Sequence, residues 1–287
     1  MTHLPRRRAL AIAIVGAGIA ATLALTGCSQ GSPSASQGNP AEDLPSSHVH
    51  GVARDSGKVN LATHEGLFVL QPDASWKQVG PVVDWMGFAV SAPGVFYASG
   101  HPGAGVDLPQ PVGLMKSTDA GATWTTLSRG GQSDFHALAA SSKGVMGFDD
   151  ALRVTPDGKT WATGGLTASP RSLAAAPDGS KVLATTGQGV QSSTDQGRTW
   201  APLAGAPLML MTAWADAKTV VGFTVEGTLA VSVDAGVTWK SGTAKVSMGQ
   251  AISASRDKAG ALEILVVTDK AVVQSKDSGA TLTNLTT

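Results

Sequence analysis

One short phrase recurs along this chain and constrains its fold. Intact copies with the pattern Ser-x-Asp-x-Gly-x-Thr-Trp occupy residues 117–124, 193–200 and 232–239, and degraded copies occupy residues 71–76, 155–161 and 275–282. The aspartates of the six copies are Asp73, Asp119, Asp157, Asp195, Asp234 and Asp277, so successive copies lie 46, 38, 38, 39 and 43 residues apart. A period near forty with one turn phrase per unit is typical of a β-propeller. The spacing therefore predicts a ring of six similar units.

The residue types in the phrase indicate a structural turn. Short Asp, Ser and Thr side chains accept hydrogen bonds from backbone N–H groups a few residues ahead. Glycine supplies a positive φ that a Cβ would resist, and tryptophan covers the base of the hairpin while its N–H reaches an acceptor. Because every unit carries the same chemistry, we interpret each copy, called here a repeat hairpin, as part of the framework rather than a ligand or calcium site.

The repeat resembles the Asp-box, or bacterial neuraminidase repeat, of the sialidase superfamily. This resemblance implies an all-β, six-bladed β-propeller with Asp-box hairpins over residues 48–287. Each unit divides into four short strands, beginning with a β-rich run such as residues 50–53 or 86–89, and no window has a sustained helical period. We expect the fourth strand of each unit to begin at the tryptophan of its repeat hairpin.

The first 28 residues predict an export signal. Three arginines at positions 6–8 precede an apolar run over residues 9–24, and the segment ends in Leu-Thr-Gly-Cys at Cys28. This ending resembles the bacterial lipobox, which implies a lipid on Cys28 and a membrane-anchored lipoprotein on the extracytoplasmic face. The alternative is a signal-anchor helix that stays in place. Residues 29–47 have the small polar composition of a flexible tether.

The charge balance argues against a nucleic-acid partner. Removal of the three signal arginines leaves 18 basic and 21 acidic side chains, and no run of Lys or Arg follows. Cys28 is the sole cysteine, so no disulfide forms within one chain. The expected partners are the membrane, through the lipid, and a metal ion, a glycan or another envelope protein.

The histidines of the predicted propeller all map to one of its two faces. In a four-stranded blade the start of the first strand and the corner between the second and third strands lie on the same face, here called the upper face. The histidines at such positions are His48, His50, His64, His101 and His136. Met86 occupies the position equivalent to His50 and His136. Because alternate residues of a strand share one side, His48 and His50 are expected to point together.

Two interpretations of this histidine group remain open. One is a transition-metal site near the mouth of the central channel, in which histidine with Met86 would favour copper and histidine with aspartate would suit zinc. The other is a hydrogen-bonded polar lining that holds the surrounding loops in place.

The layout also resembles a group of actinobacterial Asp-box lipoproteins named as glycosyl hydrolases by their repeat, which implies no particular activity. The matching phrases are residues 48–51, 63–68, 86–88, 99–102 and 134–138. A sialidase would imply an arginine triad and a Tyr–Glu pair, but the sole tyrosine, Tyr97, lies in a second strand, and Arg171 alone opens a first strand.

Another glycosidase needs only two carboxylates at a suitable separation, so an enzyme remains an alternative. The candidate catalytic carboxylates are Asp84, Asp134 and Glu65, with Trp85 and Trp214 as aromatic platforms for a sugar. A third alternative is a non-catalytic propeller that assists assembly or binds a peptide on its face.

Overall fold

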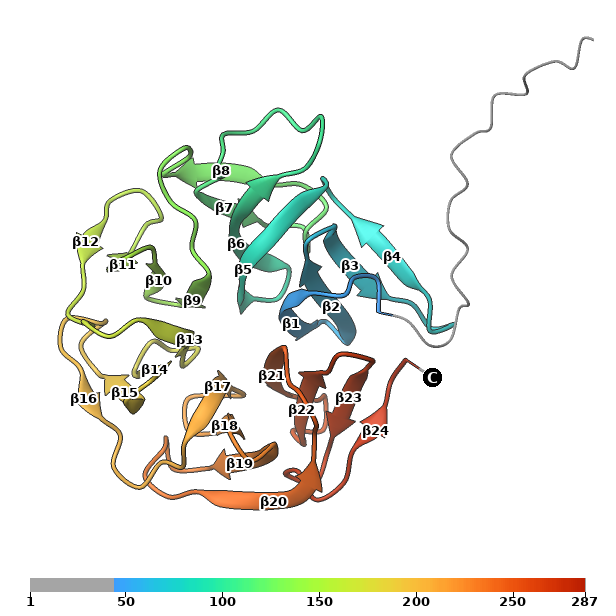
Figure 1. Cartoon of the computed structure of the whole chain (residues 1–287), viewed down its shortest axis with the longest axis vertical. Helices are drawn as coiled ribbons and strands as arrows, with labels where there is room; N and C mark the ends of the chain where they lie inside the picture. The colour runs from blue at the N-terminus through green and yellow to red at the C-terminus, as the bar shows by residue number, and fades with distance from the viewer. Residues whose placement is uncertain (1–43, 287) are drawn as a thin grey trace, which may run out of the picture. The chain divides into compact units, whose positions relative to one another are not determined.

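The computed structural model describes residues 44–286, which form an all-β propeller. Six four-stranded antiparallel sheets stand as blades around a central axis (Figure 1), and these described residues include no helix. The predicted six-bladed β-propeller is confirmed. The predicted signal segment, Cys28 and residues 29–43 of the tether lie outside the described part. Across residues 44–286, no helix has the length and apolar character needed to cross a membrane.

Each blade is built from one continuous stretch of chain. Blades one to three comprise β1 Val49–Asp55, β2 Lys58–Thr63, β3 Gly66–Leu70 and β4 Trp76–Val79; β5 Val83–Ala92, β6 Val95–Pro102, β7 Leu114–Ser117 and β8 Thr125–Ser128; and β9 Ala137–Ser141, β10 Gly144–Phe148, β11 Leu152–Thr155 and β12 Ala162–Thr163. Blades four to six comprise β13 Pro170–Ala175, β14 Val182–Thr186, β15 Gly189–Ser193 and β16 Ala201–Pro202; β17 Met209–Trp214, β18 Val220–Thr224, β19 Thr228–Ser232 and β20 Lys240–Lys245; and β21 Ala251–Arg256, β22 Leu262–Val267, β23 Val272–Ser275 and β24 Thr283–Asn284.

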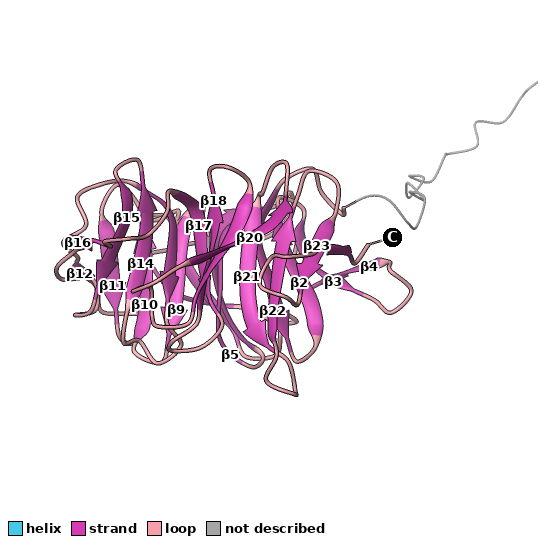
Figure 2. Ribbon diagram, turned by 90° about the horizontal axis from the view of Figure 1, so that it is seen from below, coloured by secondary structure: helices cyan, strands magenta, loops and turns pink. Residues whose placement is uncertain are grey.

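The first strand of every blade lies next to the axis, and the fourth lies at the outer rim (Figure 1). Neighbouring inner strands pack against one another around the whole ring, including β21 against β1. The ring closes by side chains rather than by a shared strand: the amide of Val49 donates to Oε1 of Gln250 at 2.8 Å, and Val49, Leu61 and Leu265 share one apolar cluster. Strands run between two loop-bearing faces (Figure 2), so equivalent positions of the blades share a face.

Four inner strands carry a bulge near their upper ends, where the pairing with the second strand skips one residue. The pairing of β1 with β2 shifts between Val49 and Gly51, and equivalent shifts occur near the upper ends of β5, β13 and β17. The residues skipped by the pairing are His50, Met86, Arg171 and Leu210. A bulge of this kind re-aims a side chain. The same turn of the backbone therefore presents a different side chain from each of these blades.

The repeat hairpins are held by one recurrent hydrogen-bond pattern. In the copy over residues 117–124, Oδ1 of Asp119 accepts from the Thr123 amide at 2.9 Å and from the Ser117 hydroxyl at 2.8 Å. The Trp124 indole N–H donates to the Gly121 carbonyl at 2.9 Å. The copies at Asp195 and Asp234 repeat these contacts. These hydrogen bonds engage most polar atoms of the hairpin, as a structural turn requires.

Three expectations about strand limits need correction. The fourth strands β8 and β20 begin one residue after their tryptophans, because the indole is occupied with the hairpin carbonyl. His101 was expected on a corner but lies inside β6, since β5 begins early enough to pair with it through Asp84. His136 immediately precedes β9 rather than opening it.

We expect the repeat hairpins to make folding stability acid-sensitive. Hydrogen bonds from Thr123 and Ser117 lower the pKa of Asp119 to about 2, and equivalent contacts lower those of Asp195, Asp234 and Asp277 to about 2. A carboxyl whose pKa is lower in the folded than in the unfolded state stabilises the fold above the unfolded pKa, and this stabilisation is lost as pH falls through the folded pKa. The midpoint temperature of thermal unfolding should therefore decrease as the pH is lowered from 4 to 2.

Asp119→Asn should lower that midpoint at pH 7 and reduce its further fall in acid. Asp73→Asn is the matched control, because Asp73 accepts only from the neighbouring Ser75 and should change the midpoint less. Equal effects of the two substitutions at pH 7 would contradict this account of the hairpins.

Candidate functional site

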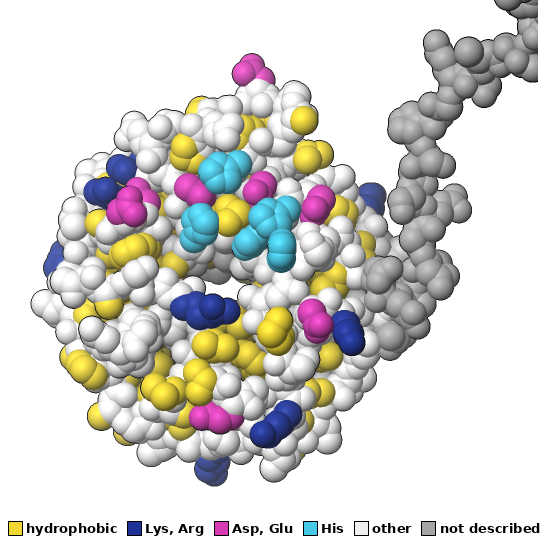
Figure 3. Space-filling model, viewed as in Figure 1, with side chains coloured by type: hydrophobic (Ala, Val, Ile, Leu, Met, Phe, Trp, Pro, Cys, Tyr) yellow, Lys and Arg dark blue, Asp and Glu magenta, His cyan; other side chains and the backbone are white. Residues whose placement is uncertain are grey.

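The five histidines of the described chain gather on one face, over the first three blades. Figure 3 shows the imidazoles together with several acidic side chains on one side of the central opening. The group consists of His48, His50, His64, His101 and His136, with Asp84 and Asp134 between them. We call these seven residues the histidine belt. The predicted gathering of the histidines on one face is observed.

Three segments of the belt share one local design, a buried anchor flanked by two more accessible polar or sulfur-bearing residues. The anchors are Val49, Trp85 and Phe135, with exposed fractions of 3%, 0% and 0%. The flanking pairs are His48 and His50, Asp84 and Met86, and Asp134 and His136. In an extended chain the residues on either side of a buried one both point away from the core. Each anchor therefore fixes the two residues beside it, and five of these six residues belong to the belt.

The anchors are held by aromatic packing and one buried hydrogen bond. Trp85 packs on Trp124 with ring centroids 4.5 Å apart, and Phe135 stacks on Trp161 at 5.2 Å. The Phe135 amide also donates to the buried hydroxyl of Ser99 at 3.0 Å. The burial of Trp85 corrects its expected role as a sugar platform, because a fully buried ring offers no stacking surface.

Trp214 is likewise no sugar platform. It is 8% exposed, and its indole N–H donates to the carbonyl of Ala174 at 3.2 Å. Both tryptophans that the repeat hairpins do not use therefore belong to the packing between blades. The aromatic support expected for a glycosidase is missing at these two positions.

The first cluster of the belt contains His50, His64 and Asp84. The two Nε2 atoms of His50 and His64 lie 3.2 Å apart, and Nδ1 of His64 lies 2.8 Å from Oδ1 of Asp84. One ligand atom from each of the three residues fits within 4.8 Å of the others. The His48 ring adjoins the cluster, with its centroid 5.2 Å from that of His64. Both His48 and His50 thus approach the ring of His64.

Local hydrogen bonds hold His64 in this cluster. It lies on the corner between β2 and β3, where the Thr63 hydroxyl donates to the Gly66 carbonyl at 2.9 Å and accepts from the Glu65 amide at 3.1 Å. The Gln78 side chain donates to the Glu65 carbonyl at 2.9 Å and braces the same corner from β4. A rigid corner places the imidazole with little loss of conformational entropy.

The contact between His64 and Asp84 is close but does not have the geometry of a hydrogen bond. The separation of 2.8 Å marks an ionic contact if the imidazole is protonated, yet Oδ1 of Asp84 is buried and has no hydrogen-bond partner among the described residues. A buried carboxylate oxygen without a donor is unfavourable. Oδ1 of Asp84 can therefore bind a cation in addition to its contact with the His64 imidazole.

The second cluster is centred on Asp134. Its Oδ2 atom lies 3.0 Å from Nε2 of His101 and 2.7 Å from Nε2 of His136. The other oxygen of Asp134 and Nδ1 of His101 are buried without a hydrogen-bond partner in the described chain. The two clusters adjoin, because Asp84 of the first pairs with His101 of the second in the register of β5 and β6. The belt is thus continuous across three blades.

The remaining predicted residues take different places. Met86 lines the mouth of the central channel together with His50 and His136. The Glu65 side chain is exposed and makes no hydrogen bond or ion pair with described residues, so the structure does not bring it into either cluster. Tyr97 packs against the apolar cluster between blades two and three and does not line the channel mouth. Sequence analysis did not identify Thr212 and Gln250, which also line the mouth, because neither residue type is distinctive there.

Burial and neighbouring imidazoles lower the pKa of His50. Desolvation lowers the pKa of His50 below its ordinary value, the adjacent His64 lowers it further, and the carboxylate of Asp84 opposes the shift. A neutral imidazole is the form that binds metal ions.

Comparisons with known proteins support the fold alone. No protein-family model matches the sequence, and no curated protein matches it. Among solved structures, the chain is similar to YCF48 bound to D1 peptide, with 15% identity, a TM-score of 0.51 and 86% of each chain covered. It is similar to the WD40 β-propeller domain of Doa1, with 16% identity, a TM-score of 0.53 and coverage of 85% of this chain and 84% of that one.

A third similar structure is an ancestral GH74 enzyme. The identity is 15%, the TM-score is 0.51, and the match covers 86% of this chain but only 38% of the enzyme. These likenesses place the chain among the β-propellers. They do not indicate the function of the histidine belt, which follows only from the residues of this chain.

We expect the titration of His50 to report the first cluster directly. His64→Ala should raise the pKa of His50, because His64 lowers it, whereas Asp84→Asn should lower the pKa of His50 by removing a carboxylate that raises it. The imidazole resonances, followed by NMR between pH 4 and pH 8, measure both shifts. Because the pKa is lower in the folded state, the contribution of neutral His50 to stability is lost as pH falls below its unfolded value.

Thr186→Ala, on the equivalent corner of blade four, is the control and should leave the His50 titration unchanged. Shifts of the same sign for His64→Ala and Asp84→Asn would contradict the electrostatic account.

Proposed function

We propose that the first cluster of the histidine belt binds a transition-metal ion, copper or zinc. The observation that carries this proposal is the 3.2 Å separation between the Nε2 atoms of His50 and His64. Two imidazole nitrogens bound at 2.0–2.1 Å with a tetrahedral angle between them lie about 3.3 Å apart. The side chains therefore already have the spacing that a shared ion requires.

Each residue of the cluster has a defined part in this proposal. His50 and His64 supply nitrogen ligands through their Nε2 atoms. A proton on Nδ1 of His64, next to the carboxylate of Asp84, leaves the lone pair of Nε2 free for the ion. Asp84 acts either through this imidazole or as an oxygen ligand, and its buried, unpaired Oδ1 supports both. His48 adjoins the cluster as a candidate fourth ligand.

The donor set limits the choice of metal. Imidazole with carboxylate suits zinc and copper(II), while a thioether would favour copper(I). Met86 lies at the neighbouring channel mouth with His50, which keeps copper in the proposal. The second cluster is a weaker candidate, because Nε2 of His101 and Nε2 of His136 are both already engaged by Asp134.

Titration with zinc and with copper(II) tests this proposal. His64→Ala should reduce the affinity by at least about tenfold, because it removes one ligand and releases Asp84. His101→Ala is the matched control, since it removes an imidazole from the second cluster and should leave the affinity nearly unchanged. Isothermal titration calorimetry measures the binding, and electron paramagnetic resonance of the copper(II) protein should show nitrogen ligation that His64→Ala alters. Equal metal affinity of the native protein and His64→Ala would contradict the proposal.

We also propose that the chain is an Asp-box lipoprotein held on the extracytoplasmic face of a membrane. The supporting observations are the Leu-Thr-Gly-Cys ending at Cys28 and the hydrogen bonds of the repeat hairpins. Cys28→Ser should abolish incorporation of labelled palmitate and move the protein from the membrane fraction to the soluble fraction. Ser29→Ala, next to the proposed lipid site, is the control. Retention of Cys28→Ser in the membrane fraction would favour the signal-anchor alternative.

A further inference from the structure

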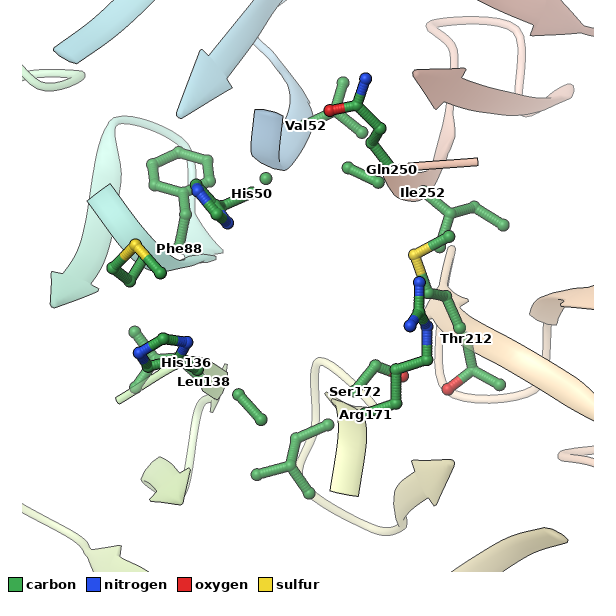
Figure 4. Close-up of a pocket in the computed structure, with 16 residues that line it drawn as sticks. His50, Val52, Phe88, His136, Leu138, Arg171, Ser172, Thr212, Gln250 and Ile252 are labelled. Carbon is green, nitrogen blue, oxygen red and sulfur yellow. The ribbon is translucent and has the colours of Figure 1, made fainter. Parts of the chain in front are cut away.

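The mouth of the central channel is a concave site that adjoins the histidine belt. It encloses a cavity of about 280 Å³ lined by the upper ends of all six inner strands. Figure 4 shows His50 and His136 on one side of the opening, with Arg171 and Thr212 on the other. His50 and Arg171 are both residues skipped by the pairing of their inner strands. The bulges therefore deliver polar side chains to a common opening.

Arg171 brings an uncompensated positive charge to this mouth. Its side chain is exposed and makes no ion pair or hydrogen bond with any described residue. No acidic side chain is among the described residues that line the cavity. The carboxylates of the belt, Asp84 and Asp134, lie against imidazoles and form no ion pair with Arg171. A permanent cation in a concave site without a counter-charge attracts anions.

Thr212 supplies a second, independent sign of a ligand. The residue is 5% exposed, and its buried hydroxyl has no hydrogen-bond partner in the described chain. It lines the mouth and also the channel section below it. A buried hydroxyl without a partner is costly, and an oxygen of a ligand held by Arg171 would satisfy it.

Below the mouth the character of the lining side chains changes. The next section is lined largely by hydrophobic side chains, with one Thr, one Ser and Arg54 as the polar exceptions. The residues shared by the mouth and this section are Val52, Phe88, Leu138, Leu173, Thr212 and Ile252. The mouth thus opens directly onto a shaft whose lining side chains are mainly hydrophobic.

We propose that this channel binds a small organic carboxylate with an apolar tail. The carboxylate would form a bidentate pair with the guanidinium of Arg171 and accept a hydrogen bond from Thr212. The tail would extend along the axis between Phe88, Leu138 and Ile252, where apolar surface is removed from water. This site is separate from the proposed metal site, although His50 borders both.

Octanoate is the probe, with acetate and 1-octanol as partial ligands that carry only the head group or only the tail. The binding is measured by isothermal titration calorimetry on the full chain, purified in EDTA to remove metal ions. Octanoate should bind at least about tenfold more tightly than acetate or 1-octanol, because only octanoate contacts both Arg171 at the mouth and the hydrophobic side chains of the shaft. Equal binding of octanoate and acetate would exclude a role for the shaft, and equal binding of octanoate and octanol would exclude one for Arg171.

Two substitutions locate the site. Arg171→Leu should weaken octanoate binding at least about tenfold, because it removes the charged partner. Arg198→Leu, an equal loss of charge in the repeat hairpin of blade four, should change nothing. Ala213→Phe narrows the shaft and should remove the advantage of octanoate over acetate while leaving zinc binding intact. Unchanged octanoate affinity in Arg171→Leu would overturn the proposal.

The metal and carboxylate proposals fail separately. His64→Ala should lose metal binding and keep octanoate binding in EDTA, because His64 does not line the channel mouth. Arg171→Leu should keep metal binding and lose octanoate binding. Loss of both ligands in either variant would show that the two sites are one, and would contradict the separation proposed here.

Discussion

The upper face depends on close packing of the six inner strands around the axis. Because the strands pack side by side, one position in each comes to the same rim, and at three of the four bulges the residue skipped by the pairing lines the opening. His50, Met86, Arg171 and Leu210 occupy this position in four blades. The backbone is repeated while the side chain is free to change. A substitution at this position can therefore change the chemistry of the upper face without changing the packing that holds the ring together.

The approach of blades two and three shows how tight this packing is. A Cβ added to Gly87, next to the bulge at Met86, would overlap the carbonyl oxygen of Phe135. A Cβ on Gly51 would lie 2.8 Å from the Cβ of Phe88. The residue after the bulge must therefore be glycine in these two blades. This close contact fixes the separation between neighbouring blades, and through the anchors it fixes the spacing of the histidine belt.

Local signals were enough to predict the architecture and the common face of the histidines. Each repeat hairpin is held by hydrogen bonds within a few residues, so its residue types and period report the blade directly. Two of the pairs that make the clusters, His64 with Asp84 and His101 with Asp134, join different blades. Their contacts depend on how the blades are rotated and packed, which no local pattern encodes. For the same reason the sequence could not distinguish a buried Trp85 from an exposed one.

The adjacency of the belt and the channel mouth has a thermodynamic consequence for the two proposed ligands. His50 lies 3.2 Å from His64 in the first cluster and also lines the mouth opposite Arg171. A cation held by the first cluster would add positive charge on the side of the mouth opposite the guanidinium. The negative carboxylate between them would be attracted to both positive charges across a partly desolvated gap. Such a cation would strengthen the binding of a carboxylate, and by linkage the carboxylate would strengthen metal binding by the same factor.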